Sequence, residues 1–478
     1  MRQSTLQGEL YASAAAAAIL GTAICYDARP GLNWALWTML VATELALFAR
    51  SRLGANRAAF HVTIALAVVL GIGAGVTTNP ASIALILITV ATLLGVAARL
   101  AAGTPAPLLG VRELVRMPLR ATMDAIRESY ARVESTARVM FSDAGASVTR
   151  GVVIAIPVVV VFAALLAGAD PTLSSWLHAL SKLLSDWSWL PRFMFFCVLA
   201  TLSLGSFGLA AGGLITASPP ASTSGAQFVL GNTERRIVVG AVDALFALFL
   251  ALVAFVSPPQ GQSYTSYVHN GFSQLTIVAT LSVILVAVLH NGRPRVGTPW
   301  GTLALLAECE LLVASALHRI AVYQRDYGYT ALRMWVTAYM LVVAALLVLV
   351  AYEVAHPVLV DARRFVRRGA VLSVAALAVM VYGNPDAWVA NLELHRYQTT
   401  GKVNVSYLSE LSADAVPSLL TVAAALPPGC AERLRLVQHE VITRPIAWYE
   451  WNWRQSRAQR ALRAYHAPTA GGCQVQPW

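Results

Sequence analysis

Apolar runs of about 20 residues recur along most of this chain and constrain its fold more than any other feature. A helix of that length crosses the hydrocarbon core of a bilayer, whereas a soluble domain rarely repeats such runs. Only 12% of the 478 residues are charged, which is about half the share found in ordinary globular chains. We therefore predict an all-α fold, a polytopic helical membrane bundle embedded in a lipid bilayer.

The pattern predicts about eleven transmembrane helices. They cover residues 8–26, 31–49, 58–77, 80–99, 150–169, 192–216, 236–257, 272–290, 299–321, 331–353 and 368–384. Residues 100–149 alternate charged with apolar positions and predict an amphipathic cytoplasmic connection, either along the membrane face or as a solvated helical hairpin. Residues 171–190 contain three tryptophans and predict an interfacial helix on the outer side.

The arginines indicate the orientation of the chain. A net charge of +11 would suit a nucleic-acid binder, but the arginines cluster in alternate connections between spans, so no nucleic-acid partner is predicted. The connections after the second, fourth, sixth, eighth and tenth spans are rich in arginine, and those between them hold few. The positive-inside rule then places the amino terminus in the cytoplasm and the carboxyl terminus outside.

The composition changes after Gly383, which divides the chain into a transmembrane bundle of residues 1–384 and a small helical extracytoplasmic C-terminal domain of residues 385–478. Asn384-Pro385-Asp386 is a helix-start signal, and the helix that follows is expected to end at Gly401. Residues 412–417 open another helix, which is expected to end near Leu426.

Several segments resemble a known family. They are GNTERRIVVGAVDALFALFLAL (231–252), SYVHNGFSQL (266–275), ASALHRIAVYQRDYGYTALR (314–333), the stretch from Asn384 to Leu420, and EWNWRQSRA (450–458). In this order they resemble the bacterial polytopic membrane proteins grouped as domain of unknown function 4153 or 4173. The resemblance implies a multi-span protein of the bacterial inner membrane with a polar tail, and it implies no activity, substrate or catalytic residue.

Ionisable residues inside the predicted spans are candidates for function, because a buried carboxylate is costly in a bilayer. Glu308 and Glu310 lie in the ninth span and Asp243 in the seventh, and the ninth span ends at His318 and Arg319. Two interpretations stay open. The column of acids ending in His and Arg would suit a proton or cation path, or it would form an internal ion-pair clamp in which Arg319 pairs with an acid of another span.

A second set of candidates lies at the predicted outer ends of the spans. Their aromatic, imidazole and guanidinium groups would line an extracytoplasmic pocket beneath the C-terminal domain, and the set consists of Tyr264, Tyr267, His269, Tyr323, Tyr327, Tyr329 and Arg333. The alternative is an aromatic belt at the level of the lipid headgroups.

The remaining motifs are few. Cys430 and Cys473 both fall in the C-terminal segment and would form a disulfide in an oxidising compartment, or stay as two free thiols. The histidines show no metal-binding spacing, and no nucleophile elbow, Walker loop or dinucleotide fingerprint is present, so no catalytic residue, metal or cofactor is predicted.

Three functions are consistent with this pattern. The first is a non-enzymatic membrane scaffold or sensor whose outer helical domain binds a protein partner or ligand. The second is a secondary transporter or proton-coupled carrier that uses the intramembrane carboxylates. The third is a membrane enzyme of envelope metabolism. The sequence gives no oligomeric state.

Overall fold

The computed structural model describes residues 2–103, 111–140, 189–213, 232–255, 278, 280–283, 285, 300–355, 362–431 and 447–465. Every regular element in this part of the chain is helical, as the sequence predicts. Several predictions fall outside it: the span at 150–169, nearly all of the interfacial helix at 171–190, most of the span at 272–290, and the residues Tyr264, Tyr267, His269 and Cys473.

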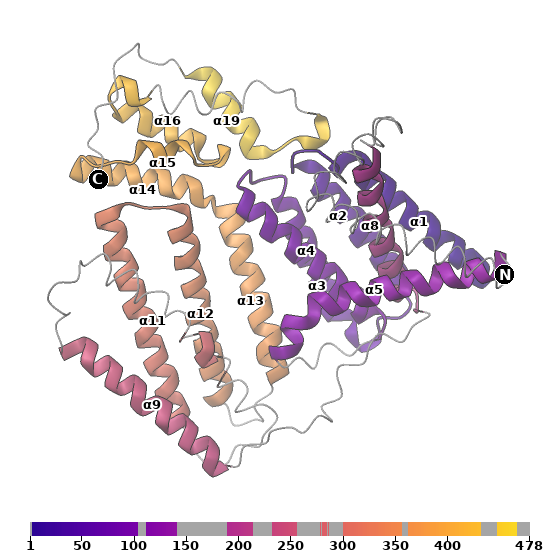
Figure 1. Ribbon diagram of the computed structural model, residues 1–478, viewed down its shortest axis with the longest axis horizontal. Coiled ribbons are helices and arrows are strands. Elements are labelled where there is room, and N and C mark those ends of the chain that lie inside the picture. The colour runs from indigo at the N-terminus through magenta and orange to yellow at the C-terminus, as the bar shows by residue number, and fades with distance from the viewer. Residues whose placement is uncertain are drawn as a thin grey trace, which may run out of the picture.

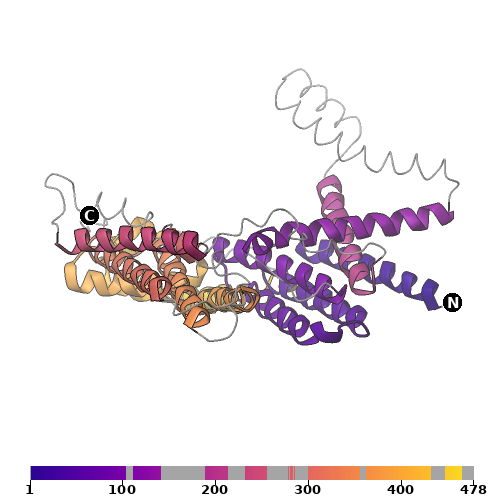
Figure 2. The ribbon, with the colours of Figure 1, turned by 90° about the horizontal axis from the view of Figure 1, so that it is seen from below.

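The helices of the bundle form two groups that lie side by side (Figure 2). The first group contains α1 (Arg2–Cys25), α2 (Leu32–Ala49), the short η1 (Gly54–Asn56), α3 (Arg57–Gly73), α4 (Pro80–Ala101), α5 (Val111–Met140) and α8 (Trp189–Ala210). The second contains α9 (Asn232–Phe255), α11 (Trp300–Tyr327) and α12 (Ala331–Ala355). Helix α13 (Ala362–Gly383) packs against both α12 and α3 and so joins the groups.

The segments after Gly383 form a C-terminal layer across one end of the helices (Figure 1). The layer consists of α14 (Pro385–Thr400), α15 (Val405–Ser409), η2 (Ala413–Ala415), α16 (Val416–Ala425), η3 (Trp448–Glu450) and α19 (Trp453–Ala464). Its apolar core includes Val389, Leu408 and Leu419. The sequence signals at its helix ends are confirmed, because Asn384 caps the start of α14, Gly401 ends it at φ 71°, and Ser412 caps η2.

Six described helices are long and apolar enough to cross a membrane: α1, α2, α4, α8, α11 and α12. Helices α13 and α14 pass the same test only as a pair, and they meet at a bend of 59°. Helix α3 and part of α9, both predicted as spans, are shorter apolar helices. These helices indicate an integral membrane protein, and the described residues support six spans, or seven with the bent pair, of the eleven predicted.

Helix α5 is amphipathic, as predicted, but its polar side faces inward. Asp124, Glu128 and Arg132 are buried against α4 and α8, where Asp124 pairs with Arg99 and Glu128 with Arg132. The opposite side carries exposed apolar side chains at a helical spacing of three and four residues: Leu119, Met123, Ile126, Tyr130 and Val133. Such a face is expected to contact lipid rather than water, so α5 packs as a member of the helix bundle.

Candidate functional site

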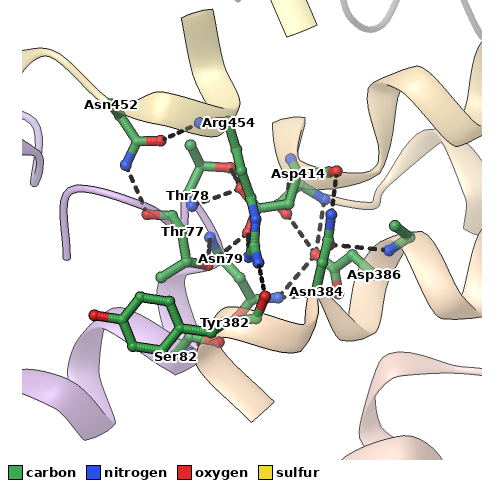
Figure 3. A network of polar contacts seen from close by, with 12 residues as sticks. Thr77, Thr78, Asn79, Ser82, Tyr382, Asn384, Asp386, Asp414, Asn452 and Arg454 are labelled. Carbon is green, nitrogen blue, oxygen red and sulfur yellow. Dashed lines mark hydrogen bonds and ion pairs between the residues drawn. The ribbon is translucent and has the colours of Figure 1, made fainter. Parts of the chain in front are cut away.

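A buried carboxylate, Asp414, joins the C-terminal layer to the first helix group (Figure 3). Its oxygens accept hydrogen bonds from the Thr77 hydroxyl (2.5 Å), the Thr78 hydroxyl (2.6 Å) and the Thr78 amide (2.7 Å). The Arg454 guanidinium adds an ion pair at 3.0 Å, with the two side chains only 1% and 8% exposed. Arg454 also donates to the Tyr382 carbonyl at 2.8 Å. Four chain segments therefore meet at one charge pair.

Asp386 makes a second set of buried contacts beside the first. The Asn79 side-chain amide donates to both carboxylate oxygens, at 2.9 and 3.2 Å. The Ser412 hydroxyl and amide donate to Oδ2 at 2.5 and 3.3 Å. Asp386 also lies in the first turn of α14, where a negative charge is favoured by the helix dipole. We call the contacts of Asp414 and Asp386 together the junction network.

The segment from Glu450 to Arg454 is held between two turns of the first helix group. The Leu32 amide donates to the Trp451 carbonyl, and the Trp453 amide donates to the Gly75 carbonyl, each at 2.9 Å. The buried Asn452 amide donates to the carbonyls of Ala74 and Thr77. The start of α19 is thereby fixed on α2 and α3, although more than 370 residues separate them along the chain.

A second polar contact ties the layer to the other helix group. The Glu393 carboxylate accepts from the Tyr329 amide at 2.5 Å, and the Arg396 guanidinium donates to the carbonyls of Arg325 and Asp326 at the end of α11. A cation at a helix C-terminus is favoured by the dipole. Gly328 lies between these groups at φ 84°, and a Cβ there would come within 2.8 Å of Glu393 Oε1. We call Glu393 and Arg396 the turn clamp.

Part of the predicted outer pocket forms an aromatic cluster in this turn. The Tyr323 and Tyr327 rings stack with centroids 4.8 Å apart, and the Arg333 guanidinium lies over Tyr323 at 4.4 Å. Tyr329 instead packs against the core of the C-terminal layer. His318 is exposed on α11. The pocket predicted from these residues stays a prediction, since its other members lie outside the described residues.

A cavity of about 480 Å³ lies where the layer meets both helix groups. We call it the junction cavity. Its wall is contributed by the turn between α1 and α2, the start of α4, the start of α12 and the C-terminal layer, and its polar side chains are Arg29, Thr78, Asn79, Asp386, Tyr407, Glu410, Ser412 and Gln455. None of the tyrosines of the predicted outer pocket is among its described lining residues.

The intramembrane acids lie between α9 and α11. The Asp243 and Glu308 carboxyl groups are within hydrogen-bonding reach of each other. Such a bond requires a proton on one of the two groups. Asp243 Oδ1, Glu308 Oε2 and Glu310 Oε1 are buried without a donor among the described residues. Arg319 lies about three turns further along α11, and its role as a clamp stays a prediction.

Two further predictions concern cysteines and metals. Cys430 is fully buried in the core of the C-terminal layer and is disulfide-bonded. Cys473, the partner that the sequence suggests, lies outside the described residues, so that pairing stays a prediction. In the part of the chain that the structure describes, no group of three or more His, Cys, Asp or Glu side chains is placed to hold a metal ion.

The sequence did not identify most residues of the junction network as functional candidates. Asp414, Asp386 and Asn79 appear in the sequence only as residues near helix starts, and Arg454 appears in a tryptophan-rich stretch. A usable signal was present in Thr77-Thr78-Asn79-Pro80, which repeats the Asn-Pro helix start of residues 384–385 between two predicted spans. Nothing in the sequence shows that these two starts face each other.

Comparisons with other proteins were made by sequence and by structure. A search of curated proteins finds no similar sequence, and a search of solved structures finds no similar fold. Residues 64–422 match the family described as Domain of unknown function (DUF4153). The match contains Thr77, Asn79, Asp386 and Asp414, whereas Arg29 and Arg454 lie outside it. The chain therefore belongs to the DUF4153 family, an uncharacterised family whose matched region includes most of the junction network.

Proposed function

We propose that this protein is a non-enzymatic scaffold or sensor of the bacterial cytoplasmic membrane. In this proposal the C-terminal layer is a helical domain on the extracytoplasmic side that binds a protein partner or ligand. The observation that carries it is the double attachment of the layer. The junction network holds it on the first helix group, and the turn clamp holds it on the second. A molecule bound to the layer would therefore act on both groups at once.

Crosslinking in living cells tests this function. Trp448 is 69% exposed on the layer, and Trp300 is 71% exposed at the far end of α11. A photoreactive amino acid in place of Trp448 is expected to give a discrete adduct, identified by mass spectrometry, that the same substitution at Trp300 does not give. No adduct at Trp448, or the same adducts at both positions, would count against a binding layer.

A proton-coupled carrier is the second candidate, and the pairing of Asp243 with Glu308 between α9 and α11 favours it. A carboxyl pair that holds one proton is a suitable element of a proton path. If the pair conducts, Glu308→Gln should abolish dye-reported proton flux in proteoliposomes, and Glu44→Gln, which changes a half-buried acid of α2, should not. Equal flux in all three proteins would rule the carrier out.

A further inference from the structure

The junction cavity contains polar side chains whose hydrogen-bonding capacity is not used within the protein. Its volume of about 480 Å³ lies within the range of about 300–1,000 Å³ typical of small-molecule sites. Asp386, on its wall, is 1% exposed and accepts bonds from Asn79 and Ser412, so this carboxylate is satisfied. The lining side chains without a bonding partner among the described residues are Arg29, Gln455 and Glu410.

Arg29 is the cation of this cavity. Its backbone is fixed, because its amide donates to Glu450 Oε1 at 3.1 Å and its carbonyl accepts from the Asn33 side chain at 3.1 Å. The residue is half-buried, and its guanidinium makes no ion pair or hydrogen bond with any described residue. A guanidinium held at a cavity wall without an anion is a binding group for a carboxylate or phosphate.

Gln455 gives an independent indication of a ligand. It is only 6% exposed, and its backbone amide is held by Asn452 Oδ1 at 3.3 Å. Gln455 lines the cavity, and its side-chain amide has no hydrogen-bond partner among the described residues. Buried amides are nearly always hydrogen-bonded, so this one is placed to meet a bound group or water.

Tyr407 and Glu410 complete the polar wall. The Tyr407 hydroxyl accepts from the Ala331 amide at 2.6 Å and retains its own proton as a donor. Burial raises the pKa of this phenol above its ordinary value, so it stays a donor at neutral pH. Glu410 is exposed at the cavity and its carboxylate has no cation partner among the described residues.

The charges decide which ligand fits. Arg29 contributes one positive charge, and Asp386 and Glu410 contribute two negative ones. A simple anion would bind Arg29 but would be repelled by the two carboxylates. A ligand with an anionic group and an ammonium group would pair with the arginine and with a carboxylate. We propose that the junction cavity binds a small zwitterion, whose anionic group is held by Arg29, Gln455 and Tyr407 and whose ammonium group is held by Glu410.

This inference rests on the proposed function of the layer as a binding element, and it names the ligand class. A zwitterion of this kind has two sources, a free amino acid or the headgroup of an ethanolamine phospholipid. The full-length protein in phosphatidylglycerol nanodiscs would be titrated with glycine and with O-phosphoethanolamine by calorimetry. In parallel, native mass spectrometry would count phosphatidylethanolamine molecules retained from mixed nanodiscs.

Binding in at least one arm is expected, and it should weaken about tenfold or more in Arg29→Gln and in Glu410→Gln. The matched control is Arg457→Gln, an exposed arginine of α19 outside the cavity, which should bind like the wild type. Glu410 is exposed, so its variant is expected to fold even if Arg29→Gln does not.

The proposal is overturned if neither arm shows binding, or if both variants bind like the wild type. It is also overturned if inorganic phosphate binds as tightly as O-phosphoethanolamine and Glu410→Gln changes neither. Because the Trp448 crosslink does not involve the cavity, a crosslink without zwitterion binding would reject this ligand class alone. Zwitterion binding without a crosslink would reject the protein partner and keep the cavity.

Discussion

At the scale of single residues, Asp414 is the buried carboxylate at which the C-terminal layer is joined to the first helix group. It accepts two hydroxyl bonds and one amide bond from Thr77 and Thr78 and pairs with Arg454, all in a buried setting. Removing one partner of a buried pair leaves an uncompensated charge and typically costs about 3–5 kcal/mol. We expect Asp414→Asn to destabilise the protein by an amount of this order, because Arg454 would lose its counter-charge.

Thermal unfolding in nanodiscs, followed by tryptophan fluorescence, would measure the loss. Asp27→Asn is the matched control, because Asp27 is exposed and Asn tolerates its φ of 53°. A melting temperature for Asp414→Asn equal to that of the control would mean that the junction network does not stabilise the fold.

The same residues show what a sequence can and cannot reveal at this scale. Asn384, Gly401 and Ser412 were identifiable because helix caps depend on neighbours within a few positions. Asp414 was not, because its partners Thr77 and Thr78 are 337 and 336 residues away along the chain. Glu308 was identifiable as costly in a membrane, but the sequence did not show that the Asp243 carboxyl group of α9 lies close to it.

At the scale of elements, the sequence largely predicts where helices form and how long they are. It does not always predict which side of a helix is buried. The alternation of charged and apolar positions in residues 100–149 predicts an amphipathic connection, and α5 is the helix that forms within it. In a soluble protein its apolar side would face the core, whereas in α5 the polar side does. The reason is that lipid, unlike water, does not penalise an exposed apolar face, so buried ion pairs can occupy the inner side.

The contact between α5 and α8 explains how this inversion is packed. A Cβ at Gly205 of α8 would overlap the backbone carbonyl of Ala125, and one at Gly208 would overlap the Arg132 side chain. Arg132 donates to the Gly208 carbonyl at 3.1 Å. Small residues allow membrane helices to approach closely enough for such backbone bonds. An apolar run predicts α8 and the alternation of charged and apolar positions predicts α5, but only the structure shows that the two helices pack together.

At the scale of the whole molecule, the junction cavity constrains how the chain is threaded. Arg29, Thr78, Ala331 and Asp386 all line it, so the α1–α2 turn, the α3–α4 turn, the start of α12 and the start of α14 share one end of the bundle. The predicted topology places these same four connections on one side. The chain must therefore cross the membrane an even number of times between one of these connections and the next, whatever the total number of spans.

The opposite end gathers the connections that are rich in arginine. Asn56, after α2, donates to the Leu100 carbonyl at the end of α4 at 3.1 Å, and Arg52 lies against Gly212 after α8. Arg50, Arg52, Arg57 and Arg99 belong to this end. By the positive-inside rule this end is expected in the cytoplasm, and the C-terminal layer is expected on the other side.

Reporter fusions test this orientation. A phosphatase that is active only outside the cytoplasm, fused after Trp478, is expected to be active, and a fluorescent protein that folds only inside is expected to be dark there. Fusions after Arg52, in the arginine-rich connection that follows α2, should give the reverse pattern and serve as the matched control. Cytoplasmic activity after Trp478 would invert the bundle, place the junction cavity on the cytoplasmic face, and remove periplasmic zwitterions from its possible ligands.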